Sequence, residues 1–266
     1  MELTENKLTH KNYYQNTDYV SNSMLNHLSG KSPSHLRFML DNPQPATQAM
    51  KLGSAIHMNV LQPEEFNNNY AVSPKFDKRT KVGKEGYKNF INNNLSKTII
   101  SEMDFELIEQ ITLKLKRDET VKDLLKNGES EKIITWNNET YDVNCKGMLD
   151  YYRPEHNIII DLKTTQDSSY NGFYNSVRKY KYHKQAAFYM DAVGAEEFYI
   201  IAVEKTAPFA VNIFQIGEDL IEEGREMYNR DLEVYKYCLD NDYWPEEGYD
   251  FLDKDSERTI HIMNRV

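Results

Sequence analysis

The sequence predicts a mixed α/β fold, in which a central mixed sheet is flanked by helices and preceded by a mainly helical part. Apolar residues recur at helical spacing up to residue 127, and the pattern changes to β-rich after Gly128. From there the predicted order is three strands, a helix, two strands and a helix, which is typical of a mixed α/β core. We find no internal repeat or low-complexity linker, so we expect a single domain over residues 1–266. Its parts are a helical N-terminal part (1–127), a sheet part (128–216) and an acidic helical C-terminal part (217–266).

The N-terminal part begins with two short predicted helices in residues 20–41. Ser23 can cap the first helix and Gly30 can end it. The second helix is predicted to start at Ser32-Pro33 or at Ser34, because serine and proline are common at helix starts.

Three further segments complete the N-terminal part. Residues 47–62 have an apolar helical pattern that contains His57 and is stopped by Pro63. Residues 74–86 are basic, contain glycine and lack periodicity, so they predict a mobile loop. Residues 102–127 predict an amphipathic helix, because Leu, Ile and Val recur there at helical intervals.

The first three strands of the sheet part are predicted from β-rich and alternating segments. Residues 132–136 (KIITW) are β-rich, Asn137-Asn138 could form a hairpin turn, and residues 140–150 alternate as a strand does. A turn at Arg153–Asn157 leads to residues 157–164, where three consecutive isoleucines predict a buried central strand.

The rest of the chain predicts two long helices around two strands. Residues 170–193 form a long helix candidate, and residues 196–205 and 209–216 predict strands. Residues 218–240 predict an acidic amphipathic helix.

The net charge of −10 is unevenly distributed. Residues 217–257 hold 15 acidic and four basic side chains, so the remaining chain sums to +1. Residues 74–88 carry six Lys/Arg, and residues 178–184 carry four. Local basic patches therefore survive, and a nucleic-acid partner is compatible with the overall acidity. An ordinary solvated surface is the alternative interpretation of each patch.

The two cysteines, Cys145 and Cys238, lie far apart and form no CxxC spacing. This excludes a zinc ribbon or a cysteine-ligated iron–sulfur cluster within the chain, and we expect a reducing compartment. No segment approaches the about 18 apolar residues of a membrane span, and the first residues contain no apolar signal region. We expect a soluble, cytoplasmic protein without a membrane partner.

Chemistry is predicted where two strands end in charged residues. Asp150 ends one predicted strand, and after ten intervening residues Asp161 and Lys163 lie near the end of the next. Residues i and i+2 of a strand share a face, and neighbouring strands lie about 4.8 Å apart, so two carboxylates and an ammonium can converge. A surface salt bridge is the alternative for an isolated Asp-x-Lys. The buried strand argues against it, because charges that follow such a strand are costly unless paired or bound to metal.

Such a group of side chains fits phosphodiester hydrolysis. Carboxylates suit a hard divalent cation such as Mg²⁺, which binds substrate phosphate and lowers the pKa of bound water. A lysine can orient the attacking water or stabilise the charge that develops on the phosphate.

Three motifs, at residues 52–66, 147–165 and 182–189, together resemble those of a known nuclease superfamily. Residues 147–150 (GMLD) followed by 161–165 (DLKTT) look like the PD-(D/E)xK signature, and residues 182–189 contain a QxxxY element like that of the RecB-type branch. Residues 52–66 contain a Gly-xxx-His element and LQPEEF, which resemble phage RecE-type recombination exonucleases. The similarity runs from about residue 21 to about residue 214 and implies a restriction-endonuclease-like core.

The resemblance implies roles for particular residues, which we take as predictions. The catalytic group comprises Lys163, Asp150, Asp161, Gln185 and Glu131. The metal ligands comprise His57, Asp150, Asp161 and Leu162. The DNA contacts comprise Tyr182, Gln185 and Tyr189 from the resemblance, and Arg178, Lys181, Lys81 and Lys84 from the two basic segments.

Several alternatives stay open at this point. His57 could be a satisfied core histidine, Tyr182 could serve ordinary helix packing, and Glu129 competes with Glu131 for the glutamate before the strand pair. Imidazole suits Mn²⁺ somewhat better than Mg²⁺, so either metal is expected. Many relatives carry an arginine where this chain has Met148, which puts one phosphate contact in doubt.

The resemblance implies a metal-dependent exonuclease that degrades one strand of linear double-stranded DNA processively, 5′ to 3′, and leaves 3′ single-stranded tails. It further implies a ring-shaped homo-oligomer, trimer or tetramer, a single-strand annealing partner, and a phage or prophage origin in a bacterial host. In such a ring, the acidic region 217–257 would lie outside, and segments 74–88 and 178–184 would line the channel. A structure-specific endonuclease and a non-catalytic DNA-binding module of the same fold are the alternatives.

Overall fold

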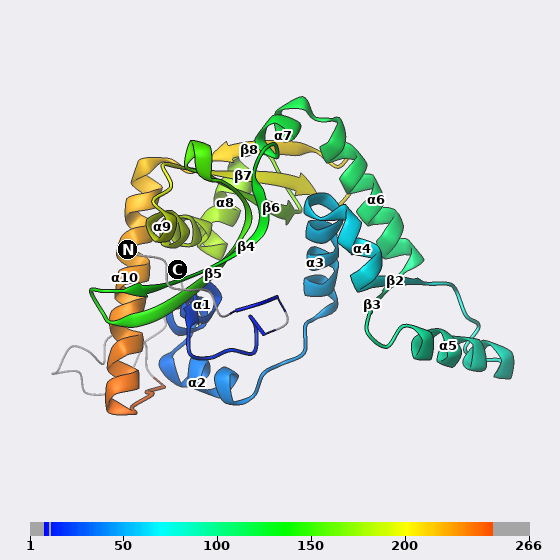
Figure 1. The fold of residues 1–266 in the computed structure, drawn as a ribbon, viewed down its shortest axis with the longest axis horizontal. Coiled ribbons are helices and arrows are strands. Elements are labelled where there is room, and N and C mark those ends of the chain that lie inside the picture. The colour runs from blue at the N-terminus through cyan, green and yellow to red at the C-terminus, as the bar shows by residue number, and fades with distance from the viewer. Residues whose placement is uncertain (1–7, 11, 247–266) are drawn as a thin grey trace, which may run out of the picture.

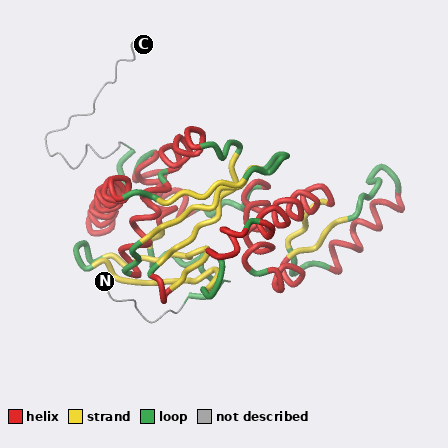
Figure 2. Tube along the Cα trace, turned by 90° about the horizontal axis from the view of Figure 1, so that it is seen from above, coloured by secondary structure: helices red, strands yellow, loops and turns green. Residues whose placement is uncertain are grey.

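The computed structural model describes residues 8–10 and 12–246. Its centre is a six-stranded sheet in the order β1-β5-β6-β7-β8, with β4 also paired to β5 (Figures 1 and 2). The β6–β7 pair is parallel, and the β4–β5, β5–β6 and β7–β8 pairs are antiparallel, so the predicted mixed sheet is confirmed. The strands are β1 (Val20–Ser21), β4 (Glu129–Asn138), β5 (Val143–Arg153), β6 (Ile158–Thr165), β7 (Glu197–Glu204) and β8 (Val211–Gln215).

Helices cover both faces of this sheet, as predicted. One face packs on α1 (Asn22–Gly30), α2 (Pro33–Asp41), α8 (Tyr170–Tyr180), α9 (Tyr182–Val193) and α10 (Glu218–Asn241). The other packs on α3 (Gln48–Leu61), α4 (Pro63–Asn69), α6 (Glu102–Arg117) and α7 (Glu119–Leu124). Strand alternation divides β6 between the two cores, since Ile159 enters the first and Ile160 the second.

A helical arm extends from the second group of helices (Figures 1 and 2). The parallel strands β2 (Tyr70–Ser73) and β3 (Thr98–Ser101) form its base, and α5 (Lys81–Asn93) forms its outer part. No residue of α5 is buried. The strands β2 and β3 and the helix α4 were not predicted from the sequence.

Three of the predicted elements have different boundaries in the structure. The loop predicted at 74–86 is wrong from Lys81 onward, because the Thr80 hydroxyl accepts the N–H of Gly83 and starts a helix. The helix predicted over 170–193 is two helices, interrupted at Lys181 by a left-handed backbone (φ 57°). The stretch 102–127 also divides, because Asp118 caps a second short helix.

Smaller corrections concern caps and turns. The first helix is capped by Ser21, whose side chain accepts from the N–H of Met24, and not by Ser23. Asn137 and Asn138 end β4, and the turn follows at residues 139–142. The turn predicted at Arg153–Asn157 contains the 3₁₀ helix Pro154–His156.

The acidic helix α10 packs directly against α9, which corrects the predicted separation of charges. Arg178 pairs with Glu223, and the fully buried Lys184 pairs with Asp231. Segment 178–184 is therefore partly neutralised by the region that was expected to lie apart from it. Residues 247–266 of the acidic part lie outside the described residues. None of the helices in the described part combines the length and apolar character that crossing a bilayer requires.

Candidate active site

Strands β5 and β6 separate at the two predicted aspartates. Their register pairs Tyr151 with Ile160, and Asp150 and Asp161 come next, where the ladder has ended. Across the opening, Asp150 Oδ2 accepts a hydrogen bond from the backbone N–H of Leu162 at 2.8 Å. The other edge of β5 is paired with β4 along its length, so the opening lies between β1 and β6. The two carboxylates therefore converge where the sequence spacing placed them.

The predicted lysine completes an ion pair at this opening. Lys163 Nζ lies 2.7 Å from Asp161 Oδ2, and Gln185 Nε2 donates to Asp161 Oδ1 at 3.0 Å. Burial, helped by the charge of Asp150 and opposed by Lys163, raises the pKa of Asp161 to about 6. Burial disfavours the charged lysine, but Asp161 and Asp150 outweigh it and raise the pKa of Lys163. Lys163 is therefore an ammonium at neutral pH.

A second group of side chains adjoins this pair. His57, Glu131 and Asp150 each offer a ligand atom within 4.8 Å of the others. His57 Nδ1 lies 3.3 Å from Asp150 Oδ2, because α3 passes beside β5 and presents His57 to the opening. Burial opposes protonation of His57, yet the charge and hydrogen bond of Asp150 raise its pKa to about 9. The pKa of Asp150 is lowered, because His57 and Lys163 outweigh its burial.

The backbone of β4 directs Glu131 into this group. Ser130 and Lys132 on either side of it pair with β5, whereas Glu131 has a left-handed backbone (φ 52°) and no partner in the ladder. Such a conformation is strained for a residue with a side chain, and it is found preferentially at functional sites. Burial and the nearby Asp150 raise the pKa of Glu131 to about 7. Glu129 lies outside the group, 52% exposed and paired with Lys132.

The donor set fits a hard or borderline divalent cation. Two carboxylates and one imidazole face one another, and burial, with the neighbouring charge of Asp150 as the second cause, raises the pKa of Glu131, so a bound cation would stabilise its ionised form. Asp161 is beside the group, with its carboxylate held by Lys163 and Gln185. The side chain of Leu162 is buried in the second core and its N–H donates to Asp150, so its backbone carbonyl is the only group that could ligate a metal.

The site lies in a cleft of about 710 Å³. The cleft is lined by the metal-ligand group, the base of the arm, α3 and the N-terminal segment, and the Lys163–Asp161 pair lies behind this lining. Among its lining residues are Tyr14, Gly53, His57, Tyr70, Thr98, Glu131, Met148, Asp150 and Tyr189. Gly147 lets Tyr189 pack over β5, because a Cβ at that position would lie 2.8 Å from the tyrosine ring.

Comparison with known proteins agrees with this geometry. The family described as a PDDEXK-like domain of unknown function (DUF3799) matches residues 21–250. The chain belongs to this PDDEXK-like family. No curated protein matches its sequence.

A solved structure shares the fold of this PDDEXK-like chain. The crystal structure of a protein from Eubacterium rectale, provisionally named an exonuclease, aligns with a TM-score of 0.65 and 19% identity over 97% of both chains. A phage-related exonuclease from Haemophilus somnus aligns with a TM-score of 0.34 and 12% identity, over 71% of this chain and 95% of the other. The first likeness confirms the mixed α/β nuclease-like fold, and the second carries no argument.

The predicted DNA contacts of the PDDEXK-like chain are spread over three places. Tyr189 lines the cleft, and the ring of Tyr182 lies 5.0 Å from Lys163 Nζ. Lys81 and Lys84 are exposed on the arm. Two basic residues of segment 178–184 have protein partners instead, since Arg178 pairs with Glu223 and Lys181 Nζ donates to Ser29 Oγ at 3.0 Å.

Sequence reasoning missed the N-terminal segment that forms one wall of the cleft. The buried Lys146 donates to the backbone carbonyls of Tyr13 and Asn16, each at 2.6 Å, and its ammonium lies 4.8 Å from the Tyr13 ring. This holds Tyr14 in the cleft lining. A lysine inside an alternating strand, beside Gly147, is the one signal that could have indicated a buried partner.

Proposed function

We propose that the chain is a metal-dependent exodeoxyribonuclease that hydrolyses phosphodiester bonds of linear double-stranded DNA. The observation that carries the proposal is the meeting of two groups at one sheet opening. Lys163 supplies a positive charge that Asp161 holds in place, and His57, Glu131 and Asp150 supply a compact set of metal ligands. Membership of the PDDEXK-like family supports a nuclease, and the provisional name of the Eubacterium rectale protein supports the exonuclease class.

Each side chain has a distinct part in the proposed hydrolysis. His57, Glu131 and Asp150 would hold Mg²⁺ or Mn²⁺, with Asp161 and the Leu162 backbone beside them. The bound cation would supply an activated water and would neutralise charge on the scissile phosphate. Lys163, kept charged by its carboxylate neighbours, stabilises the negative charge that builds on the phosphate oxygens. The N–H of Leu162 fixes Asp150, and Gln185 fixes Asp161, so neither carboxylate must reorient during turnover.

The arm and cleft suit a nucleic-acid duplex in this proposal. Asn69, Tyr70, Ser96 and Thr98, at the base of the arm, line the same cleft as the metal-ligand group. The outer part of the arm carries the basic segment 74–88, with exposed Lys81 and Lys84. We propose that these lysines contact phosphates of the duplex while its end enters the cleft.

The finer features of the proposal follow the RecE-type resemblance. We propose 5′-to-3′ polarity, 3′ single-stranded product tails, a trimeric or tetrameric ring around DNA, and a single-strand annealing partner that takes up the tails. A phage or prophage origin and a bacterial cytoplasmic location belong to the same proposal. The Gly53–His57 element and residues 61–66 (LQPEEF) support this branch of the superfamily.

End-labelled DNA tests the function. Linear duplex labelled at 5′ or 3′ ends, and covalently closed circular duplex, are incubated with Mg²⁺, Mn²⁺ or a chelator. We expect metal-dependent release of 5′ label as mononucleotides, retention of 3′ label on long single strands, and an intact circle. Cleavage of the circle, which has no free end, would show that the protein is an endonuclease and not an exonuclease. If the protein binds DNA but hydrolyses none with either metal, it would be a non-catalytic DNA-binding module.

The oligomeric state has its own test. Light scattering at micromolar protein, with DNA and a divalent metal present, should give the mass of a trimer or tetramer. A monomer under these conditions would contradict the ring, and it would leave the hydrolytic proposal intact.

A further inference from the structure

Two tyrosines from different walls of the cleft adjoin the metal-ligand group of His57, Glu131 and Asp150. Tyr14 belongs to the N-terminal segment, Tyr70 begins β2 at the base of the arm, and both line the cleft. Burial, followed by the charge of Glu131, raises the pKa of both phenols, to about 12 for Tyr70. Tyr14 is itself a further cause of the shift at Tyr70. The two hydroxyls and the Glu131 carboxylate therefore lie close to one another in the cleft.

The fold holds the rings of both tyrosines and makes no use of their hydroxyls. The ring of Tyr70 is buried and stacks on Phe66, with centroids 5.0 Å apart and planes 17° apart. Tyr14 is 80% exposed, and its ring meets that of Tyr13 edge-on at 5.2 Å. The carbonyl of Tyr13 in turn accepts from the buried Lys146. Among the described residues, neither Tyr14 nor Tyr70 has a hydrogen-bond partner for its hydroxyl, so both hydroxyls are available to a ligand.

The ligand that these hydroxyls suit is an anion that accompanies a cation. A phenol is protonated at neutral pH, so each tyrosine adds a hydrogen-bond donor to the cleft without adding charge. The carboxylates of Glu131 and Asp150 would repel a phosphate that arrived alone. A divalent cation held by the metal-ligand group would remove this repulsion. A phosphate bound beside that cation could then accept hydrogen bonds from both walls.

We propose that the hydroxyls of Tyr14 and Tyr70 donate hydrogen bonds to backbone phosphates of the DNA strand at the metal-ligand group. The inference rests on the proposed nuclease function and adds two phosphate-binding residues to it. Phosphate contacts carry no sequence information, which suits an enzyme that degrades whole strands. Because Tyr14 belongs to the N-terminal segment and Tyr70 to the arm, a strand bound by both joins two walls of the cleft.

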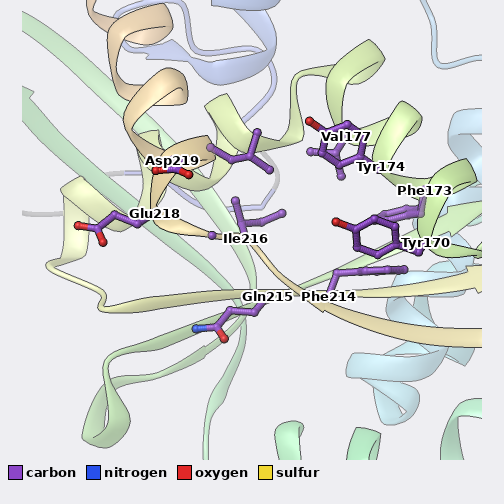
Figure 3. Close-up of a pocket in the computed structure, with 11 residues that line it drawn as sticks. Tyr170, Phe173, Tyr174, Val177, Phe214, Gln215, Ile216, Glu218 and Asp219 are labelled. Atoms are coloured by element: carbon purple, nitrogen blue, oxygen red, sulfur yellow. The ribbon is translucent and has the colours of Figure 1, made fainter.

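Removal of each hydroxyl tests the contacts and keeps the rings. Binding of a fluorescein-labelled duplex to the full chain is followed by anisotropy in Ca²⁺, and a gel after each titration shows whether the duplex is intact. We expect Tyr14→Phe and Tyr70→Phe each to weaken binding about tenfold, and the double variant to lose more than either. Tyr170→Phe is the matched control and should bind as the wild type does, because Tyr170 is 71% exposed in a separate groove of about 560 Å³ (Figure 3).

Methylphosphonate linkages test whether the bound group is a phosphate. Each duplex of a set carries one such linkage, among the three nearest either end, in which a methyl group replaces a charged oxygen. We expect the wild type to lose affinity at the contacted linkage. The deficit of the matching phenylalanine variant should shrink on that duplex, because the hydrogen bond is already weakened there. An equal deficit of the variants on every duplex would overturn the phosphate contact.

The contrary results separate this inference from the proposed function. Wild-type affinity in the double phenylalanine variant, with an unchanged circular dichroism spectrum, overturns both contacts and leaves the nuclease proposal intact. Equal loss in Tyr170→Phe also overturns them, because that tyrosine lies outside the cleft. If the Tyr14 and Tyr70 variants bind weakly while the wild type hydrolyses no DNA in Mg²⁺ or Mn²⁺, the proposed function fails and the contacts stand. A wild type that binds no duplex overturns both proposals.

Discussion

Two lysine–aspartate pairs differ in what surrounds them. Lys163 and Asp161 meet beside the residues that line the cleft, with side chains 18% and 3% exposed, whereas Lys184 and Asp231 meet between α9 and α10 and are 0% and 1% exposed. Neighbouring residues of α9 serve the two pairs, since Lys184 belongs to the buried pair and Gln185 donates to Asp161. Residue type and position in sequence therefore do not distinguish a chemical pair from a structural one.

The balance of charges around each pair distinguishes the structural pair from the pair at the active site. Burial lowers the pKa of Lys184, and its single aspartate only partly compensates, so that pair is a matched ion pair in the core. At the cleft, Asp161 and Asp150 together raise the pKa of Lys163, and Glu131 adds a third carboxylate. Three carboxylates stand there against one ammonium and the imidazole of His57, so a divalent cation could bind in place of the His57 proton. We therefore expect changes at the first place to affect catalysis and changes at the second to affect folding.

The largest expected effect on catalysis is that of Asp150→Asn. The substitution removes a predicted metal ligand and the partner of His57, so we expect the rate of duplex hydrolysis to fall about a thousandfold or more. Initial rates at saturating Mg²⁺ measure this, with the circular dichroism spectrum as a control for folding. A rate within tenfold of the wild type would mean that the cleft group does not hold the metal.

Lys184→Ala should have the largest effect on stability. It leaves Asp231 buried without its ammonium, and we expect the free energy of unfolding to fall by about 3–5 kcal/mol in urea. The double variant Lys184→Met, Asp231→Leu should recover most of this loss and retain hydrolysis. If that folded double variant were inactive, the buried pair would have a role in chemistry and the comparison would fail.

Gln185→Ala should have an intermediate effect. The amide holds Asp161 beside Lys163, and the loss of such a supporting hydrogen bond lowers activity about 10- to 100-fold. Stability should change by about 1 kcal/mol at most. Gln185→Glu keeps the size of the side chain but adds negative charge, so activity should not return. A Gln185→Ala enzyme with full activity would show that Lys163 alone positions Asp161.

The smallest effect concerns pH and Glu131. Burial and Asp150 raise its pKa from 4.5 to about 7. Without metal, the folded state binds the extra proton in this window, so the free energy of unfolding should decrease as pH rises from 4.5 to 7. Glu131→Gln removes this contribution and should be the more stable protein at pH 8 in chelator, on the order of 1 kcal/mol. Identical pH dependence in urea titrations of both proteins would contradict the assigned burial.

The sequence predicted the sheet and its acidic opening because both depend on local patterns. Three isoleucines mark β6, and the i, i+2 spacing places Asp161 and Lys163 on one face. The resemblance located His57 and Gln185, which come from separate helices. Glu131 was only one of two alternatives, because the left-handed backbone that selects it is not visible in composition.

Other features depend on contacts between distant residues and were missed. Strands β2 and β3 pair across about 25 intervening residues, and each alone is too short to be predicted. The wall that Lys146 holds through two backbone carbonyls has no motif at all. The neutralisation of Arg178 and Lys184 by α10 is likewise a tertiary effect, so a count of charges along segment 178–184 overestimated its free positive charge.

One paired assay tests the central claim most directly. Hydrolysis of end-labelled linear duplex in Mg²⁺ or Mn²⁺ is compared for the wild type, for Lys163→Met, and for the double variant Lys184→Met, Asp231→Leu. We predict that Lys163→Met folds and binds DNA but loses about a thousandfold in rate, while the double variant cleaves at the wild-type rate. Wild-type cleavage by folded Lys163→Met would contradict the assignment of the active site.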